Sequence, residues 1–291
     1  MKTSSAPQLS GVRSFLFGGL ALVWFGEGLF TGVQPFAEVW TRLWKMFPPD
    51  NPQLAATLYI THAFEAPLKA ALLVLALFGL RSSNPAARTA LFVSMSLVPP
   101  INIAFHFRAQ GFPLGSMAVA TTLSAILWGS FFLIREPAQP TEEEGRTSPW
   151  DVVQYGWFAL NATVLTLLAL LFLFAPRTAL YWEFPCRSDL FDAHQGELAS
   201  LLVSTLAAGS HLTALATATW IAAAKCRTNS TLRQAVTLAS IASTALICLL
   251  PLRQVVLHDG WNCARSPILL PFVPLLIGWV LYAAVSRTRG E

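Results

Sequence analysis

Residues 14–33 form an unbroken hydrophobic stretch of twenty residues that contains one carboxylate, Glu27. At a helical rise of about 1.5 Å per residue, twenty residues span roughly 30 Å, the thickness of a bilayer's hydrocarbon core. A charged group at that depth costs on the order of 2.5–3.5 kcal/mol unless it faces a bundle interior or a wet cavity. The stretch therefore predicts a membrane-spanning helix packed against other helices. Glu27 is then either a functional group or a buried acid that only hydrogen-bonds a neighbouring helix.

The rest of the chain has the composition of a polytopic membrane protein. Hydrophobic residues make up 54% of it and charged residues 12%, against about a quarter charged in soluble domains. We predict an all-α membrane helix bundle of about eight transmembrane helices in two four-helix halves. The predicted spans are approximately 14–34, 54–80, 89–107, 116–134, 152–175, 198–224, 234–257 and 267–285.

The two halves follow the same four-span plan. The first half covers residues 1–136, a polar cytoplasmic linker covers 137–149, and the second half covers 150–291. A P-x-x-N-x-x-x-H motif at residues 99–106, near the end of the third span, matches P-x-x-Q-x-x-x-H at residues 251–258, near the end of the seventh. Because each half has four spans, the repeat is parallel in the membrane.

The positions of the basic residues predict the orientation. With these spans, eleven Lys and Arg residues fall at the ends shared with the termini and six at the opposite ends. The positive-inside rule therefore places both termini in the cytoplasm, and an integral, multi-pass protein of the endoplasmic reticulum membrane is expected if the source is eukaryotic. No basic run is interleaved with aromatic residues, so nucleic acid is not an expected partner.

The cysteines and the longest predicted loop bear on metals and disulfides. Cys186 and Cys263 both fall in predicted extracytoplasmic loops, where a disulfide between them is expected. No CxxC motif occurs, and His194, with Asp192 and Glu197 near it, fits no standard zinc spacing. We therefore expect neither a metal nor a cofactor.

Polar residues inside the spans mark the candidate site. His62, Glu65 and Lys69 of the second span lie on one helical face, and Asn102 and His106 of the third span are one turn apart. Glu65 and Lys69 form an ion pair in the alternative, purely structural interpretation. The polar residues lie toward the extracytoplasmic side, which predicts a pocket open to one leaflet and lined by the residues of these spans.

Three short motifs and one further glutamate in residues 17–134 resemble the EXPERA domain of the emopamil-binding sterol isomerases. They are EGLF at 27–30, LWK at 43–45, Glu65 at the place of the second intramembrane glutamate of the family, and AILW at 125–128. The second half resembles a degenerate second copy of that domain. The resemblance implies a pocket for a sterol- or terpenoid-like lipid, in which a proton is added to a double bond and removed elsewhere.

The same resemblance implies roles for particular residues. Glu27 and Glu65 would be the acid/base carboxylates, with Glu65 carrying the proton and Glu27 stabilising the cation, and Trp128 would face that cation. The family has a histidine where this chain has Val23, and an asparagine where this chain has Ala125 or Ser124. His62, one turn before Glu65, can replace the missing histidine. The expected substrate-binding residues are Trp24, Asn102, His106 and Trp128.

These features favour an intramembrane isomerase or cyclase that acts on an apolar sterol- or terpenoid-like lipid through a carbocation. The alternative from a different class is a non-catalytic lipid-binding or trafficking protein of the same fold, which the loss of the family histidine favours. A transporter and a haem protein stay open as weaker alternatives. The substrate, the source organism, the oligomeric state and the role of the second half do not follow from the sequence.

Overall fold

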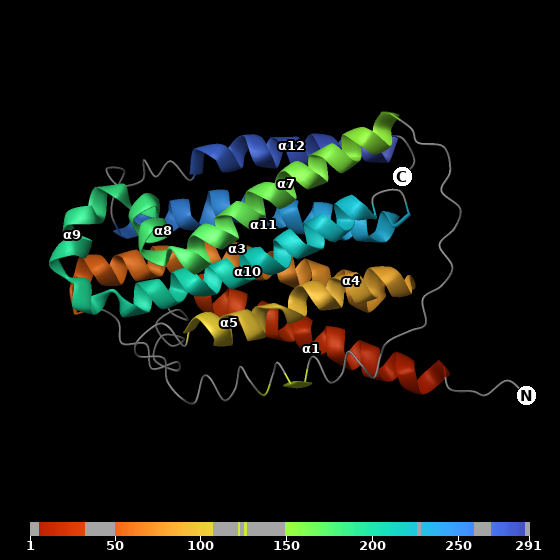
Figure 1. Ribbon diagram of the computed structural model, residues 1–291, viewed down its shortest axis with the longest axis horizontal. Coiled ribbons are helices and arrows are strands. Elements are labelled where there is room, and N and C mark those ends of the chain that lie inside the picture. Colours follow the sequence, from red (N-terminus) through yellow and green to blue (C-terminus); the bar gives the residue numbers. More distant parts are fainter. Residues whose placement is uncertain are drawn as a thin grey trace, which may run out of the picture.

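The computed structural model describes residues 6–32, 50–106, 122, 125–126, 149–225, 228–258 and 269–288, and these residues form helices and short connections without a strand. The predicted all-α class is therefore confirmed. Its long helices are α1 (Ala6–Gly32), α3 (Pro52–Arg81), α4 (Pro85–Ser96), α5 (Val98–His106), α7 (Pro149–Phe174), α10 (Ala199–Ala224), α11 (Ser230–His258) and α12 (Leu269–Thr288) (Figure 1). Four short helical segments, α8 (Pro176–Glu183), η1 (Pro185–Arg187), α9 (Ser188–Ala193) and η2 (Gln195–Glu197), connect α7 to α10.

Among the residues that the structure describes, five apolar segments are long enough to cross a membrane, which is compatible with an integral membrane protein. They are Pro52–Arg81, Pro85–Phe105, Pro149–Phe174, Ala199–Ala224 and Ser230–Leu249, and the shorter apolar helices Ser14–Leu29 and Phe272–Thr288 accompany them. Seven of the predicted spans thus coincide with apolar helices. The eighth, 116–134, lies almost wholly outside the described residues, as does Trp128. Of the predicted linker 137–149, only Pro149 is described. The count of eight spans and the division into two halves stay predictions.

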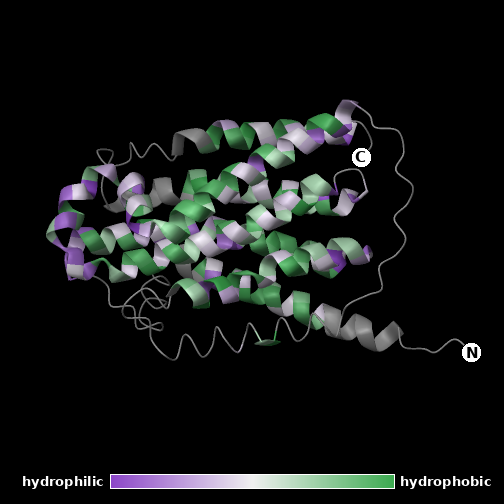
Figure 2. Ribbon diagram, in the orientation of Figure 1, coloured by the Kyte–Doolittle hydropathy of each residue, from purple (hydrophilic) through white to green (hydrophobic). Residues whose placement is uncertain are grey.

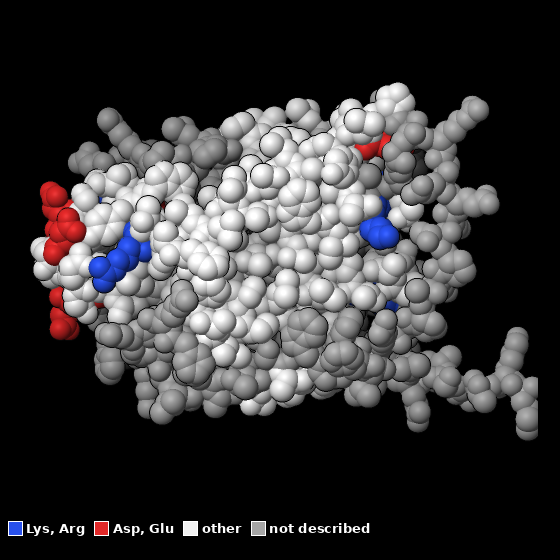
Figure 3. Space-filling view, in the orientation of Figure 1, with Lys and Arg blue, Asp and Glu red and all other residues white. Residues whose placement is uncertain are grey.

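Apart from Glu27, Glu65 and Lys69 inside the bundle, the charged side chains that the structure describes gather at its two ends. Figure 2 shows hydrophobic residues along the long helices, and Figure 3 shows an uncharged middle on the face in view. The end where α1 begins and α12 finishes carries Arg81, Arg88, Lys225, Arg233 and Arg287, with Asp151 as an acid. The α9 end carries Asp50, Arg177, Glu183, Arg187, Asp189, Asp192 and Glu197. We call the first of these the basic end.

Asparagine caps fix where several helices begin. The Asn51 side chain accepts hydrogen bonds from the N–H groups of Gln53 and Leu54, and Pro52 occupies the first helical position of α3. Asn84 accepts from Ala87 N–H at the start of α4 in the same way. These side chains satisfy N–H groups that have no carbonyl partner within the helix, and the proline has no such group to satisfy.

Helices α3 and α10 lie at the centre of the bundle. Helix α3 packs against α1, α10 and α11, and α10 packs against α7, α3, α5 and α4. Helices assigned to the first half therefore intermix with helices assigned to the second (Figure 1). The buried alanines of α10 allow this close approach, because helices in membranes associate mainly through tight packing of small residues. These are Ala208, Ala214, Ala218, Ala222 and Ala223.

The segments α8 to η2, residues 176–197, form a cap over the start of α3. The guanidinium of Arg187 donates hydrogen bonds to the carbonyl of Gln53 and to the hydroxyl of Thr57. The N–H of Asn51 donates to Glu197 Oε2 at 3.2 Å. Cys186 is disulfide-bonded, with its partner outside the described residues, so its pairing with Cys263 stays a prediction. A region expected to be a loop is thus a helical cap held by polar contacts and a disulfide.

A glycine sets how closely α1 and α3 approach. A Cβ atom at Gly79 would lie 2.1 Å from the ring of Phe17, a side chain only 3% exposed. We expect Gly79→Ala to lower the free energy of unfolding by about 1–3 kcal/mol, because the buried ring cannot move without disturbing its neighbours. Thermal unfolding in detergent measures this. Gly156→Ala on α7 is the matched control, since nothing lies within 4 Å of a Cβ there; an equal loss in both variants would contradict the close-packing explanation.

Candidate functional site

Two carboxylates from different helices converge on one buried lysine inside the bundle. The Nζ atom of Lys69 lies 2.9 Å from Glu65 Oε2 and 3.8 Å from Glu27 Oε2. The side chains of Lys69 and Glu65 are 3% and 5% exposed, whereas that of Glu27 is 26% exposed. Lys69 therefore compensates the charge of Glu65 more fully than that of Glu27, and Glu27 is the more accessible of the two carboxylates.

Helical periodicity places three of these groups on one face of α3, and α1 lies in contact with that helix beside Glu27. His62, Glu65 and Lys69 stack on one face of α3, which continues through Pro67. On α1, Gly28 follows Glu27, and a Cβ atom at Gly28 would already be 3.7 Å from Cβ of Lys69. That is an ordinary van der Waals distance, so α1 packs directly against α3 at the height of the lysine.

Helix α10 supplies the third side of the cluster. The hydroxyl of Ser204 donates a hydrogen bond to Glu65 Oε1, so both carboxylate oxygens of Glu65 have a partner. His211, two turns further along the same face, is 2% exposed, and its Nδ1 lies 2.5 Å from the carbonyl of Ala207. Since a carbonyl only accepts, this nitrogen carries the hydrogen. The rings of Trp24 and His211 pack edge to face, with 5.5 Å between their centroids.

His62 lies beside this cluster with one ring nitrogen unused. Its side chain is 2% exposed, and it is close enough to Glu65 for an electrostatic interaction. In the described part of the chain, its Nδ1 makes no hydrogen bond. An unpaired ring nitrogen in an apolar interior is costly, so this position is suited to accept or donate a proton.

A small apolar cavity lies between α3, α7, α10, α11 and α12. Its volume is about 70 Å³, and Leu68 and Leu212, neighbours in sequence of Lys69 and His211, form part of its wall. Pockets for drug-sized ligands usually measure about 300–1,000 Å³. A lipid would therefore need more space than this cavity offers, and the partly exposed side of Glu27 is the better approach to the cluster.

The expected site residues have different outcomes. The structure brings together Glu27, His62 and Glu65, and joins Trp24 to them through His211. Asn102 lies half-buried on α5, which packs against α10. His106 ends α5, but its side chain, like all of Trp128, lies outside the described residues. No protein family, curated protein or solved structure matches this chain. The resemblance to the EXPERA domain therefore rests on the sequence motifs alone.

Sequence reasoning did not assign Ser204, His211 or Glu183 to the site. Ser204 and His211 are seven residues apart on one face of a predicted span, which is a usable signal for a polar helix face. Glu183 gives no such signal, because it ends the short α8 helix in a region expected to be a solvated loop. The structure buries it to 2% exposure, within electrostatic reach of Glu65.

Glu183 makes the stability of the protein dependent on pH. Burial, and then the nearby charge of Glu65, raise the pKa of Glu183 from 4.5 to about 8. Between those values the folded protein binds a proton that the unfolded chain has released, so stability falls as the pH rises from about 4.5 to about 8. One such group lowers the free energy of unfolding by up to about 1.4 kcal/mol per pH unit in this range. We expect Glu183→Gln to abolish this contribution.

Thermal unfolding at several pH values between 5 and 8 tests this expectation. The wild-type Tm should fall more steeply with pH than that of Glu183→Gln. Asp189→Asn, at an exposed position of the same cap, is the control and should follow the wild type. Parallel curves for the wild type and Glu183→Gln would show that Glu183 is ionised in the folded protein throughout.

Proposed function

We propose that this protein is an intramembrane isomerase or cyclase that moves a proton on a sterol- or terpenoid-like lipid. The observation that carries the proposal is the convergence of Glu27 and Glu65 on Lys69 inside the bundle, with His62 beside them. Ionisable groups inside a membrane are expensive and are usually functional. One ion pair would neutralise one carboxylate, whereas here a second carboxylate from another helix shares the same lysine.

The contacts favour an exchange of the two carboxylate roles expected from the resemblance. Glu65 is held by Lys69 and Ser204, both of which favour its ionised form, so it suits the negative charge that stabilises a cation. Glu27 is further from Lys69 and partly exposed, so it suits the acid that gives up a proton to the lipid.

The proposed reaction balances without a cofactor. Glu27 donates its proton to a carbon–carbon double bond, which leaves a tertiary carbocation on the lipid and a carboxylate on Glu27. The Glu65 carboxylate stabilises the cation, and His62 removes a proton from a neighbouring carbon to form the new double bond. In a cyclisation, a second double bond of the lipid attacks the cation before that proton is lost. One proton enters the lipid and one leaves it, so the product is an isomer of the substrate. Glu27, which is partly exposed, then regains a proton from water, and His62 releases one, before the next turnover.

The orientation belongs to the same proposal. The excess of lysine and arginine at the basic end supports a cytoplasmic position for that end, where α1 begins and α12 finishes. The cluster then lies in the part of the bundle that is nearer the cap. A membrane of the endoplasmic reticulum is the proposed location if the source is eukaryotic.

Deuterium incorporation tests the proposal. The lipids that co-purify with the protein are identified by mass spectrometry, and the purified protein is then incubated with them in deuterated buffer. An isomerase that protonates carbon should add deuterium to the lipid, and Asp189→Asn, a carboxylate change in the cap, should do so at the wild-type rate. Recovery of a bound lipid without deuterium uptake or a new isomer would contradict the enzyme proposal.

A non-catalytic lipid-binding protein is the second candidate. Two observations favour it. The Glu65–Lys69 ion pair is explained equally well by a structural role, the neutralisation of two buried charges, and Val23 stands where the family that the chain resembles has a histidine. In that case the same experiment yields a bound, unlabelled lipid. The Glu27→Gln variant would then retain the lipid to the same extent as the wild type.

A further inference from the structure

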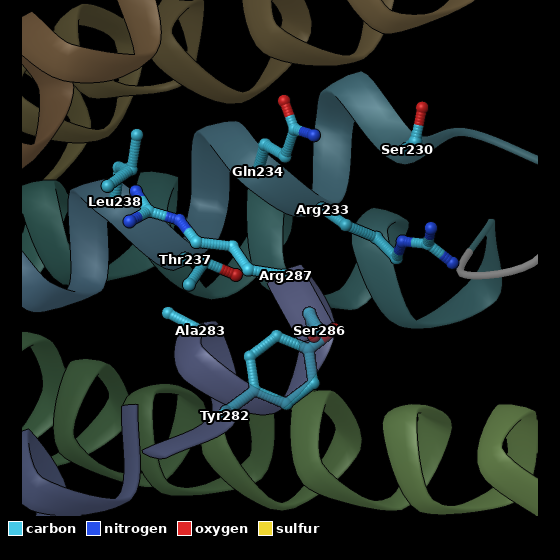
Figure 4. Close-up of a pocket in the computed structure, with 9 residues that line it drawn as sticks. All are labelled: Ser230, Arg233, Gln234, Thr237, Leu238, Tyr282, Ala283, Ser286 and Arg287. Atoms are coloured by element: carbon cyan, nitrogen blue, oxygen red, sulfur yellow. The ribbon is translucent and has the colours of Figure 1, made fainter. Parts of the chain in front are cut away.

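A pocket lies at the basic end of the bundle, far from the carboxylate cluster. It is formed by the first turns of α11 and the last turns of α12, and its volume is about 230 Å³ (Figure 4). Its polar lining includes Thr237, Ser286 and Arg287. Nothing in the proposed chemistry of Glu27 and Glu65 uses these residues.

The Thr237 hydroxyl is buried and unsatisfied. The residue is 6% exposed, and its Oγ1 makes no hydrogen bond in the part of the chain that the structure describes. Helical threonines elsewhere in the bundle donate to the carbonyl four residues earlier, as Thr205, Thr213, Thr217, Thr219 and Thr244 do. Thr237 does not, and its hydroxyl points from α11 toward α12 (Figure 4). A buried hydroxyl without a partner costs about 1–3 kcal/mol, which a ligand in the pocket would recover.

The facing side of α12 adds a second hydroxyl and a cation. Ser286 Oγ is buried and likewise makes no hydrogen bond within the described residues. Arg287 extends from α12 across the pocket toward Leu238 (Figure 4). Arg233, which also lines the pocket, donates to Gln154 Oε1 at 2.9 Å. The site therefore offers hydroxyl donors and a positive charge, a combination that suits an anion with several acceptor oxygens.

The remaining wall carries two further polar residues, Ser230 and Gln234, and an apolar part formed by Leu238, Tyr282 and Ala283. It lies at the membrane boundary. The candidate span of α11 begins at Ser230, and the apolar part of α12 ends at Thr288, so the pocket sits where the bilayer meets water. A ligand held here can place its charged group among the hydroxyls and its hydrocarbon against the leucine and tyrosine.

We propose that this pocket binds the phosphate group of a phosphate ester at the membrane surface. The phosphate oxygens accept from the Thr237 and Ser286 hydroxyls and from the Arg287 guanidinium, which is well matched to phosphate geometry. The ester can be the headgroup of a membrane phospholipid or a soluble metabolite, because both present the same oxygens. This binding site is independent of the function proposed for the carboxylate cluster.

Binding measurements on the full-length protein in detergent test the proposal with phosphatidic acid, diacylglycerol and glycerol 3-phosphate. We expect saturable binding of phosphatidic acid over diacylglycerol, measured by native mass spectrometry. Arg287→Gln and Thr237→Val should each raise the Kd by about tenfold or more, since each removes a donor to a charged group. Competition by glycerol 3-phosphate would identify a soluble ester as a ligand, whereas its failure to compete would identify the lipid.

Matched variants separate a specific site from general effects. Arg177→Gln removes an exposed arginine at the other end of the bundle, and Thr244→Val removes a hydroxyl of α11 that already donates to Ser240. Both should bind phosphatidic acid like the wild type. Equal binding of phosphatidic acid and diacylglycerol overturns the proposal, as does a Kd that Arg287→Gln and Thr237→Val leave unchanged. Circular dichroism of each variant confirms that it is folded before its binding is compared.

Discussion

Lys69→Met should lower the free energy of unfolding by about 3–5 kcal/mol, the range observed when one partner of a buried ion pair is removed. The lysine touches both Glu65 and Glu27, at 2.9 and 3.8 Å, and is itself 3% exposed. Methionine fills a similar volume, so the loss reports the uncompensated charge of Glu65 and not a cavity. Chemical or thermal unfolding in detergent measures it. Lys225→Met, at an exposed lysine after α10, is the control and should change stability by less than about 0.5 kcal/mol.

A second substitution shows that the effect is electrostatic. Adding Glu65→Leu to Lys69→Met removes one of the two carboxylates and should restore much of the lost stability, because buried pairs can often be replaced by apolar residues at little cost. The interaction free energy from this double-mutant cycle then measures the coupling of the pair. If Lys69→Met alone costs less than about 1 kcal/mol, the Glu65–Lys69 ion pair does not contribute the expected stability, and the electrostatic explanation is wrong.

Glu27→Gln should lower kcat by about 10²–10⁴-fold while the lipid stays bound, because glutamine keeps the shape of the side chain but cannot supply the proton. Deuterium incorporation and isomer formation measure turnover, and the lipid recovered with the purified variant measures binding. Glu65→Gln should lower turnover to a similar extent, since it removes the negative charge beside the cation. It should also change stability, because it leaves Lys69 without its closest partner.

The difference between the two variants distinguishes the roles of the carboxylates. Glu27 is 26% exposed and further from Lys69, so its replacement should leave the Tm almost unchanged, whereas replacement of Glu65 should not. Asp189→Asn provides the control for a carboxylate change outside the bundle. Full turnover in Glu27→Gln would exclude Glu27 as the acid. If both variants bind the lipid and retain full function in cells, the lipid-binding alternative applies.

The sequence alone determined the features that depend on the order of residues along one helix. Hydrophobic length gave the apolar helices, because about twenty residues are needed to cross the hydrocarbon core. The 3.6-residue period put His62, Glu65 and Lys69 on one face of α3, since neighbours three and four positions apart lie on the same side of any α-helix.

Only the tertiary structure decided which of these faces meet. The contact of Glu27 with Lys69, the hydrogen bond from Ser204 to Glu65 and the burial of Glu183 all join segments that lie far apart in the chain. Periodicity fixes rotation within a helix but not which helix packs against which. That choice depends on how small residues such as Gly79, and the alanines of α10, let helices approach across the bundle. For the same reason the sequence did not indicate the pocket between α11 and α12: Thr237 and Arg287 line one pocket only because the two helices pack side by side.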